Sequence, residues 1–348
     1  MIPQVILEPD LPIVDPHHHI MIMPPNPAGP EHMREGACYM LPEVLADCRA
    51  GHRVVATVLV GGMGFARQQG PEPLRVAGDT EVANGVAAQC ASGRMGAGCL
   101  VGAGLVGHAD LTTGAALGET LAAHIAAGGG RFRGIRHMTV WSDDPALAPP
   151  GRMAPADLAF HPGFRSGFAQ LAPLGLSFDA WCYFTQLDGI IDLARSFPET
   201  TLIMNHCGGP LGSFSWAPRR EEARLAWQRI TRDLAACPNV YMKLGGLGMW
   251  TTGLPSAGAR PPATAQQIAQ EQRPYLEHLI DCFGVRRCMF ESNFPVERHV
   301  GDYATIWNAF KIVTQTWSAE EKAWLYARTA MTAYRLHEDI LADTGSAA

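Results

Sequence analysis

The chain has 348 residues, 47% hydrophobic and 17% charged, which is the balance of a compact globular protein and excludes a disordered or fibrous one. Its formal net charge is −6 and it contains no cluster of lysines and arginines, so no nucleic-acid partner is expected. No segment reaches the roughly 18 apolar residues of a membrane span, and the first residues lack the basic start of a signal peptide. We therefore expect a cytoplasmic protein with no membrane partner.

The nine cysteines are scattered along the chain, and no two of them are spaced as C-x-x-C. An odd number without regular spacing favours neither a disulfide framework nor a thiolate zinc site. We interpret them as reduced and mostly buried thiols.

Short apolar segments alternate with segments of helical periodicity along the whole chain. The apolar segments are rich in β-branched residues and read as strands, at residues 11–17, 53–60, 99–106, 132–138, 176–181, 201–206, 240–246 and 288–293. A helix is predicted after each strand, at residues 41–51, 80–93, 118–129, 163–175, 187–198, 221–237, 269–284 and 303–317. Residues 318–336 predict one or two extra C-terminal helices packed on the outside.

Eight βα units most simply close into a TIM barrel, so the predicted class is an α/β protein with a (β/α)8 barrel. A doubly wound open sheet is the rival, but residues 61–66, GGMGFA, do not form the G-x-G-x-x-G fingerprint expected there. The loops contain no linker between domains, which predicts a single domain over residues 1–348 with a core of about residues 10–336.

Ionisable residues gather where the predicted strands end, which is where a TIM barrel places its reacting groups. Alternation along the first strand puts Asp15, His17 and His19 on one face and His18 on the other. Two imidazoles aimed at one point suit a divalent metal, and His206 at the end of the sixth strand would be a third ligand. The alternatives are a polar barrel mouth without metal, or a buried His206 bonded to a backbone carbonyl.

Further polar and aromatic side chains follow other strands. Lys243 interrupts an apolar strand and Arg136 ends another, so each is either an anchor for a substrate carboxylate or one half of a structural ion pair. We add to the candidate substrate-binding residues those that follow strands four, five and seven: His137, Trp141, Tyr183 and Trp250.

The motifs DPHHH, FRGIRH, LSFDAW, MNHCGGP, VYMKLGGLGM and CMFESNFPV, in this order, resemble the amidohydrolase superfamily. The resemblance covers residues 10–336 and is to the amidohydrolase 2 group of metal-dependent TIM-barrel hydrolases, which includes sugar lactonases and 2-pyrone-4,6-dicarboxylate lactonase. It implies that His17, His19 and His206 are the metal ligands. Because FRGIRHM has no lysine or glutamate to bridge two metals, the resemblance implies one metal, zinc by expectation, or none.

The sequence departs from the group where its members carry the catalytic base. The aspartate of the eighth strand falls on Asn293, and an amide cannot take a proton from the attacking water. Glu291 lies two residues earlier and could supply the carboxylate; otherwise a metal-bound water or a histidine must serve. Asn293 and Glu291 therefore join the candidate catalytic residues.

These observations predict a hydrolase, specifically a lactonase that opens a cyclic ester of a small carboxylated or hydroxylated molecule. Arg136 and Lys243 would grip the substrate and stabilise the oxyanion beside the metal. The alternatives are a metal-independent lactonase, a decarboxylase (a lyase), and a barrel that only binds a ligand. Oligomeric state is left open, with a homodimer as one option.

Overall fold

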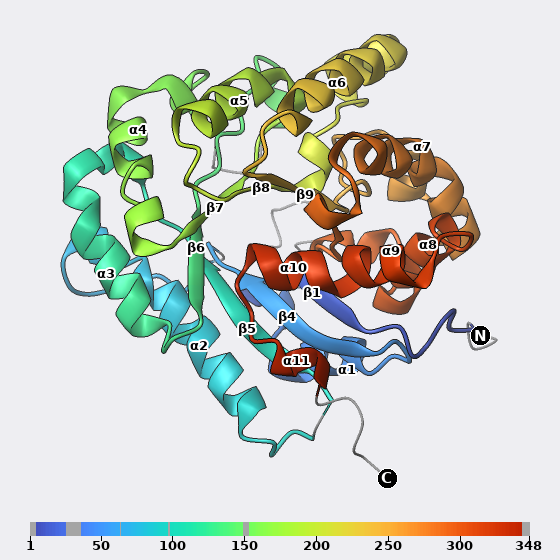
Figure 1. Cartoon of the computed structure of the whole chain (residues 1–348), viewed down its shortest axis with the longest axis horizontal. Coiled ribbons are helices and arrows are strands. Elements are labelled where there is room, and N and C mark those ends of the chain that lie inside the picture. Colours follow the sequence, from blue (N-terminus) through green and yellow to red (C-terminus); the bar gives the residue numbers. More distant parts are fainter. Residues whose placement is uncertain (1–4, 26–35, 63, 97, 149–152, 343–348) are drawn as a thin grey trace.

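The computed structural model describes residues 5–25, 36–62, 64–96, 98–148 and 153–342. Within them, eight parallel strands form one sheet whose spatial order is their chain order, so the predicted barrel is confirmed (Figure 1). Each lies where the sequence predicts one: β1 (Ile13–His18), β4 (Val54–Val60), β5 (Leu100–Gly107), β6 (Phe132–Arg136), β7 (Ser177–Ala180), β8 (Leu202–Met204), β9 (Val240–Leu244) and β10 (Cys288–Phe290).

The two ends of the sheet meet just beyond the carboxyl end of β10. His18 forms a parallel bridge with Phe294, Asn293 N donates to His17 O (2.9 Å), and His19 N donates to Phe294 O (2.7 Å). The barrel thus closes between the end of β1 and the segment that follows β10, which brings the histidines of β1 against that segment.

Helices surround the barrel and cover the outer faces of the strands (Figure 1). In the described part of the chain, seven of them come before β10: α1 (Leu41–Cys48), α2 (Ala77–Ala91), α3 (Leu117–Ala127), α4 (Pro162–Phe168), α5 (Leu187–Ser196), α6 (Arg220–Ala235) and α7 (Ala265–Phe283). The chain ends in α8 (Tyr303–Val313), α9 (Ala319–Ala323), a π-helical turn (Trp324–Arg328), α10 (Thr329–Ala333) and α11 (Asp339–Ala342). Local signals place their ends: Thr264 and Gln267, for example, form a capping box at the start of α7.

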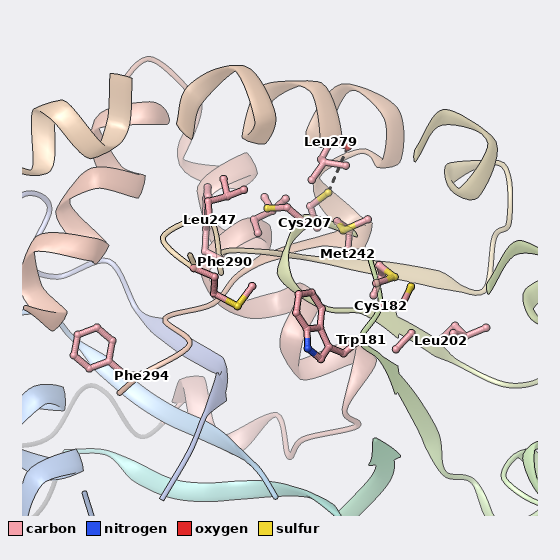
Figure 2. Packing of buried hydrophobic residues seen from close by; sticks show 14 of the residues in the cluster. Trp181, Cys182, Leu202, Cys207, Met242, Leu247, Leu279, Phe290 and Phe294 are labelled. Atoms are coloured by element: carbon pink, nitrogen blue, oxygen red, sulfur yellow. Dashed lines mark hydrogen bonds between the residues drawn. The ribbon is translucent and has the colours of Figure 1, made fainter. Parts of the chain in front are cut away.

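The surrounding helices and the outer faces of the strands form a large apolar core between them. Figure 2 shows part of it, with Leu279 of α7 lying over Cys207 and Met242, and Phe290 of β10 nearby. β8 and β10 are buried on both faces, which is why their sequences are continuous apolar runs rather than alternating ones.

The C-terminal segment differs from its predicted place. Ala330 and Tyr334 belong to the same buried cluster as Val14, Val58 and Ile203, whose strands form the barrel wall. In Figure 1, α10 lies across the barrel beside β1 and β4. The predicted extra C-terminal helices are present, but they are not confined to the outside, because small and apolar side chains of this segment pack against the strands at one end of the barrel.

A short antiparallel hairpin, which the sequence did not indicate, pairs β2 (Met21–Met23) with β3 (Ala37–Tyr39) after β1. None of the helices in the described part of the chain combines the length and the apolar character needed to cross a membrane.

Candidate functional site

An irregularity in β1 brings His17 and His19 together. The register against β4 shifts between Asp15 and His18, at a segment that contains Pro16, a residue without a backbone N–H. His17 Nε2 and His19 Nε2 lie 3.3 Å apart, while His18 faces the other way and bonds Thr57 Oγ1 (2.7 Å). A separation of 3.3 Å is about the edge of a tetrahedron of zinc ligands whose bonds are about 2.0 Å long.

Asp15 does not share that face, so its predicted place beside the two histidines is wrong. Its carboxylate accepts hydrogen bonds from Ser292 Oγ and from Tyr303 OH (3.0 Å), the latter on α8 outside the barrel. Burial raises the pKa of Asp15 to about 6, although the bonds from Ser292 and Tyr303 oppose the shift. The register shift reverses the alternation that the sequence alone suggested.

Glu291, from the end of β10, joins the histidines of two other strands. Its Oε1 accepts from the backbone N of His206 (3.0 Å) and lies 2.7 Å from His206 Nδ1. Its Oε2 lies 2.9 Å from His17 Nδ1. The side chains of Glu291 and His17 are fully buried, so this carboxylate orients both imidazoles from inside the barrel.

His17, His206 and Glu291 form the one group in the described part of the chain whose possible ligand atoms all lie close enough to hold a metal, within 4.8 Å of one another. The predicted set of ligands shares His17 and His206 with it and has His19 in place of Glu291. His19 remains adjacent, because its ring meets that of His17 edge to face at 4.9 Å.

The chemistry of these side chains suits a divalent cation. Burial and, after it, the positive charge of Lys243 hold the pKa of His17 well below its usual range. Burial does the same to His19, with Arg136 adding to it, so both rings are neutral and able to ligate. Three buried oxygens nearby have no hydrogen-bond partner among the described residues: Glu291 Oε2, Asp179 Oδ2 and Asn205 Oδ1.

Lys243 projects from β9 toward the group of His17, His206 and Glu291, here called the centre, and it is fully buried. Its Nζ lies 2.8 Å from Asp179 Oδ1 and 3.0 Å from His17 Nδ1. The structure therefore shows the ion pair with Asp179 that the sequence left as one of two options, and it places that pair against a histidine of the centre.

Arg136, at the end of β6, also reaches the centre. Its Nη2 donates to Gly61 O (2.9 Å), and its Nη1 lies 3.4 Å from His17 Nε2. The next residue, His137, is directed elsewhere, since its Nδ1 accepts from Leu111 N (3.2 Å). Burial lowers the pKa of His137 to about 4, so this imidazole is neutral.

A cavity of about 530 Å³ opens over the ends of β4, β5 and β6. His137 lines it together with His108, Asp110 and Met138. The side chains of the histidine and glutamate group do not line it, so this cavity lies beside the centre and not upon it.

The aromatic residues are distributed differently from the prediction. Tyr183 is buried and donates to Leu147 O, Trp141 lines a small pocket between loops, and Trp250 is 43% exposed. The aromatic ring beside the centre is Trp181, which is labelled in Figure 2. Its ring meets that of His206 edge to face at 4.7 Å. A signal for it existed: Trp181 follows Asp179 by two residues, and strand alternation directs both to one side.

Asn293 lies at the closing point of the barrel, with its side-chain Nδ2 buried and unpartnered among the described residues. Sequence reasoning did not single out Glu297, which follows on the next turn and is also buried. Its Oε2 accepts from Gly248 N (2.9 Å), and burial raises the pKa of Glu297 to about 8. Burial of a carboxyl group cannot be recognised from one sequence, because it depends on the loop that folds over it.

A family model described as amidohydrolase matches residues 14–336. Among curated proteins, the uncharacterized protein y4mH of Sinorhizobium fredii is 31% identical over 342 residues, covering 94% of this chain and 99% of that protein. The L-fucono-1,5-lactonase of Burkholderia ambifaria is 32% identical over 183 residues, which are 50% of each chain.

Solved structures share the fold. An amidohydrolase from Burkholderia multivorans, determined with bound zinc, superposes with a TM-score of 0.69 at 21% identity. The match covers 93% of this chain and 99% of that one.

Proposed function

We propose that this chain, which belongs to the amidohydrolase family, is a lactonase that uses a divalent metal to hydrolyse the ring ester of a small molecule. The observation that carries the proposal is the buried group of His17, His206 and Glu291 at the carboxyl end of the barrel. The relative that is an L-fucono-1,5-lactonase supports the choice of a lactone, over the half of the chain that it matches.

The chain's own residues would divide the work as follows. His17, His206 and the adjacent His19 would hold the cation, and Glu291 would support the rings of His17 and His206. Zinc is our choice because imidazole is a ligand that it takes. When bound, such an ion polarises a carbonyl and lowers the pKa of water. Zinc bound to the amidohydrolase of Burkholderia multivorans, which has the same fold, supports this choice.

Arg136 and Trp181 would place the substrate. The Arg136 guanidinium is fixed by Gly61 O on one side and reaches His17 on the other, so its charge is aimed into the centre without needing to reorganise. A preorganised donor of this kind stabilises the oxyanion that forms when water attacks an ester carbonyl. Trp181 packs on His206 and would bound the site on its apolar side.

The proton of the attacking water would go to Glu291 Oε2. Asn293 offers an amide there and cannot accept it. Oε2 is the oxygen of Glu291 that has no hydrogen bond, whereas Oε1 is held by His206. This assigns to Glu291 both the support of the histidines and the role of base.

The proposal is tested by metal content and activity measured on one preparation. We expect about one zinc per chain, hydrolysis of sugar 1,5-lactones in a panel of lactones, esters and carboxylated aromatic acids, and loss of activity with a chelator. His17→Ala and His206→Ala should abolish turnover, and His278→Ala is the matched control, since His278 bonds Thr231 between α6 and α7.

Undiminished activity in His17→Ala and His206→Ala would refute the proposal. Full activity in a metal-free preparation would leave a lactonase without metal. Release of carbon dioxide from an aromatic acid, with no lactone opened, would identify a decarboxylase instead.

A further inference from the structure

The cavity of about 530 Å³ over the ends of β4, β5 and β6 shares a wall with the centre. Arg136, which reaches His17, contacts Gly61 through the bond from its Nη2 to Gly61 O. The next residue after each of these two, Gly62 and His137, lines the cavity. A molecule in the cavity would therefore lie beside the centre.

The walls of the cavity are partly apolar and partly polar. Apolar side chains such as Val76, Met138 and Leu158 form part of them. The polar side chains among the described lining residues are two carboxylates, two imidazoles and a hydroxyl: Asp79, Asp110, His108, His137 and Thr112. A cavity of this size with apolar walls and a small number of polar groups is typical of a small-molecule site, and its polar groups decide which molecule binds.

His137 is held as a hydrogen-bond donor. Its Nδ1 accepts from Leu111 N, and a backbone N–H only donates, so the proton of the neutral ring is on Nε2. The ring meets that of His108 edge to face at 5.5 Å, and His108 is itself fixed because its Nδ1 donates to Arg136 O (3.0 Å). His137 Nε2 has no hydrogen bond to a described residue, so it offers a donor to a molecule in the cavity.

Asp110, in the loop after β5, is held as an acceptor. Its Oδ1 accepts from Thr112 N (2.9 Å) and Thr112 Oγ1 (2.6 Å), whereas no donor of the described residues reaches its Oδ2. Burial alone would raise the pKa of Asp110, but the bonds from Thr112 outweigh it and the pKa is lowered, so the carboxylate is charged at neutral pH. Asp110 Oδ1 lies 3.9 Å from His137 Nδ1, so both side chains can reach one small molecule.

A neutral donor beside a charged acceptor matches a pair of hydroxyl groups, because each hydroxyl both accepts and donates. A carboxylate in the same place would be repelled by Asp110 and has no proton to give it. We propose that His137 and Asp110 are specificity-determining residues, which bind hydroxyl groups of the substrate and make the cavity favour a neutral hydroxylated ring over a carboxylated one. Their effect on catalysis rests on the proposed function, whereas the binding of such a ring does not.

The direct test uses rings that contain no ester, so that affinity is measured without hydrolysis. The probes are the methyl glycosides of glucose, galactose, mannose and fucose, and those of glucuronic and galacturonic acid as carboxylated counterparts. We expect the parent to bind at least one neutral glycoside at pH 7, in a titration followed by NMR, and to bind the carboxylated ones more weakly.

Two variants change the proposed contacts and keep the local structure. Asp110→Asn retains an oxygen for Thr112 and should weaken the neutral glycoside about ten-fold, since a hydrogen bond to a charged group contributes about that factor. The same variant should bind the carboxylated glycosides more tightly than the parent does. His137→Asn retains an acceptor for Leu111 N but has no donor at the place of Nε2, and should weaken the neutral glycoside about five-fold.

Asp144→Asn is the matched control. Asp144 also caps a short turn, where its Oδ1 accepts from Ala146 N (2.9 Å), but it does not line the cavity. It should bind every glycoside as the parent does. Opposite effects of Asp110→Asn on neutral and carboxylated rings support the proposal, because a loss of structure would weaken both. Equal affinities of Asp110→Asn and Asp144→Asn for the neutral glycoside, or a parent that binds none of the neutral glycosides, would overturn it.

Hydrolysis gives the second readout. The parent should have a higher kcat/KM on a sugar 1,5-lactone than on δ-valerolactone, which has the same ring without hydroxyl groups. Asp110→Asn should lose about ten-fold of this preference, mainly through KM, and an unchanged preference would refute the role of Asp110 in specificity. A parent that binds the neutral glycoside as expected but opens no lactone would refute the proposed function and leave the binding inference standing.

Discussion

The buried carboxyl of Glu297 makes the stability of this protein fall as pH rises. Its pKa is raised from 4.5 to about 8, first of all by burial, and also by the charge of Glu291. A folded-state pKa above the unfolded value favours the folded state fully below pH 4.5, and that contribution is lost as pH rises through about 8. Glu297→Gln removes the titration and keeps the shape.

The magnitude follows from the size of the shift. One pKa unit corresponds to about 1.36 kcal/mol, so ionising Glu297 in the folded protein costs roughly 4 to 5 kcal/mol of unfolding free energy at high pH. The side chain is fully buried, so solvent does not screen this cost. At about 2 °C per kcal/mol for a chain of this size, the variant should gain roughly 10 °C over the parent between pH 5 and pH 9.

Melting temperatures of both proteins at pH 5, 7 and 9 check the expectation. The difference between Glu297→Gln and the parent should grow in favour of the variant at each step. At pH 5 the variant has little advantage, because the folded parent carboxyl is protonated there and bonds Gly248 as well as an amide would. A difference that is constant over this range would show that Glu297 does not titrate as its burial requires.

Three further changes test other parts of the structure. Burial lowers the pKa of His124 to about 4, so the free energy of unfolding of the parent falls by up to roughly 3 kcal/mol as pH falls from 6.5 to 4. The melting temperature of His124→Gln should therefore fall less on acidification than that of the parent, and an equal fall would contradict this. Gly246 has φ +68°, and Gly246→Ala would put a Cβ 2.6 Å from His206, so zinc affinity should fall at least about ten-fold. Gly258→Ala is the control, because its Cβ would meet nothing within 4 Å, and it should bind zinc as the parent does. Arg136→Met should lower kcat on a lactone by about 100-fold without lowering the melting temperature by more than a few degrees, and an unchanged kcat would remove its role at the oxyanion.

The sequence predicted the barrel because each strand carries its own signal. β4, for example, is seven buried residues dominated by valine, and a chain buried on both faces leaves no other reading for that run. The polar ends of the strands were predictable for the same reason, since His17 and Arg136 each break an apolar segment where it stops.

Features that depend on how distant strands meet could not be predicted from the sequence. Strand alternation placed Asp15 at the mouth, but the register shift at Pro16 turned it toward Tyr303 on α8. Glu291 was expected as a substitute base. Its contact with His17 exists because the barrel closes between β1 and β10, and its contact with His206 joins the end of β10 to the segment after β8. No local pattern encodes either contact.

The C-terminal segment shows the same limit and gives it a functional meaning. Its helical signal was clear, yet periodicity does not state which surface an apolar face will cover. Filling the barrel with α10 brings Tyr334 to Asp179, more than 150 residues away in sequence, and thereby to a lysine in contact with His17. A C-terminal truncation before Tyr334 should therefore alter the contacts of Asp179 and Lys243 beside the candidate site, and not only the stability of the barrel.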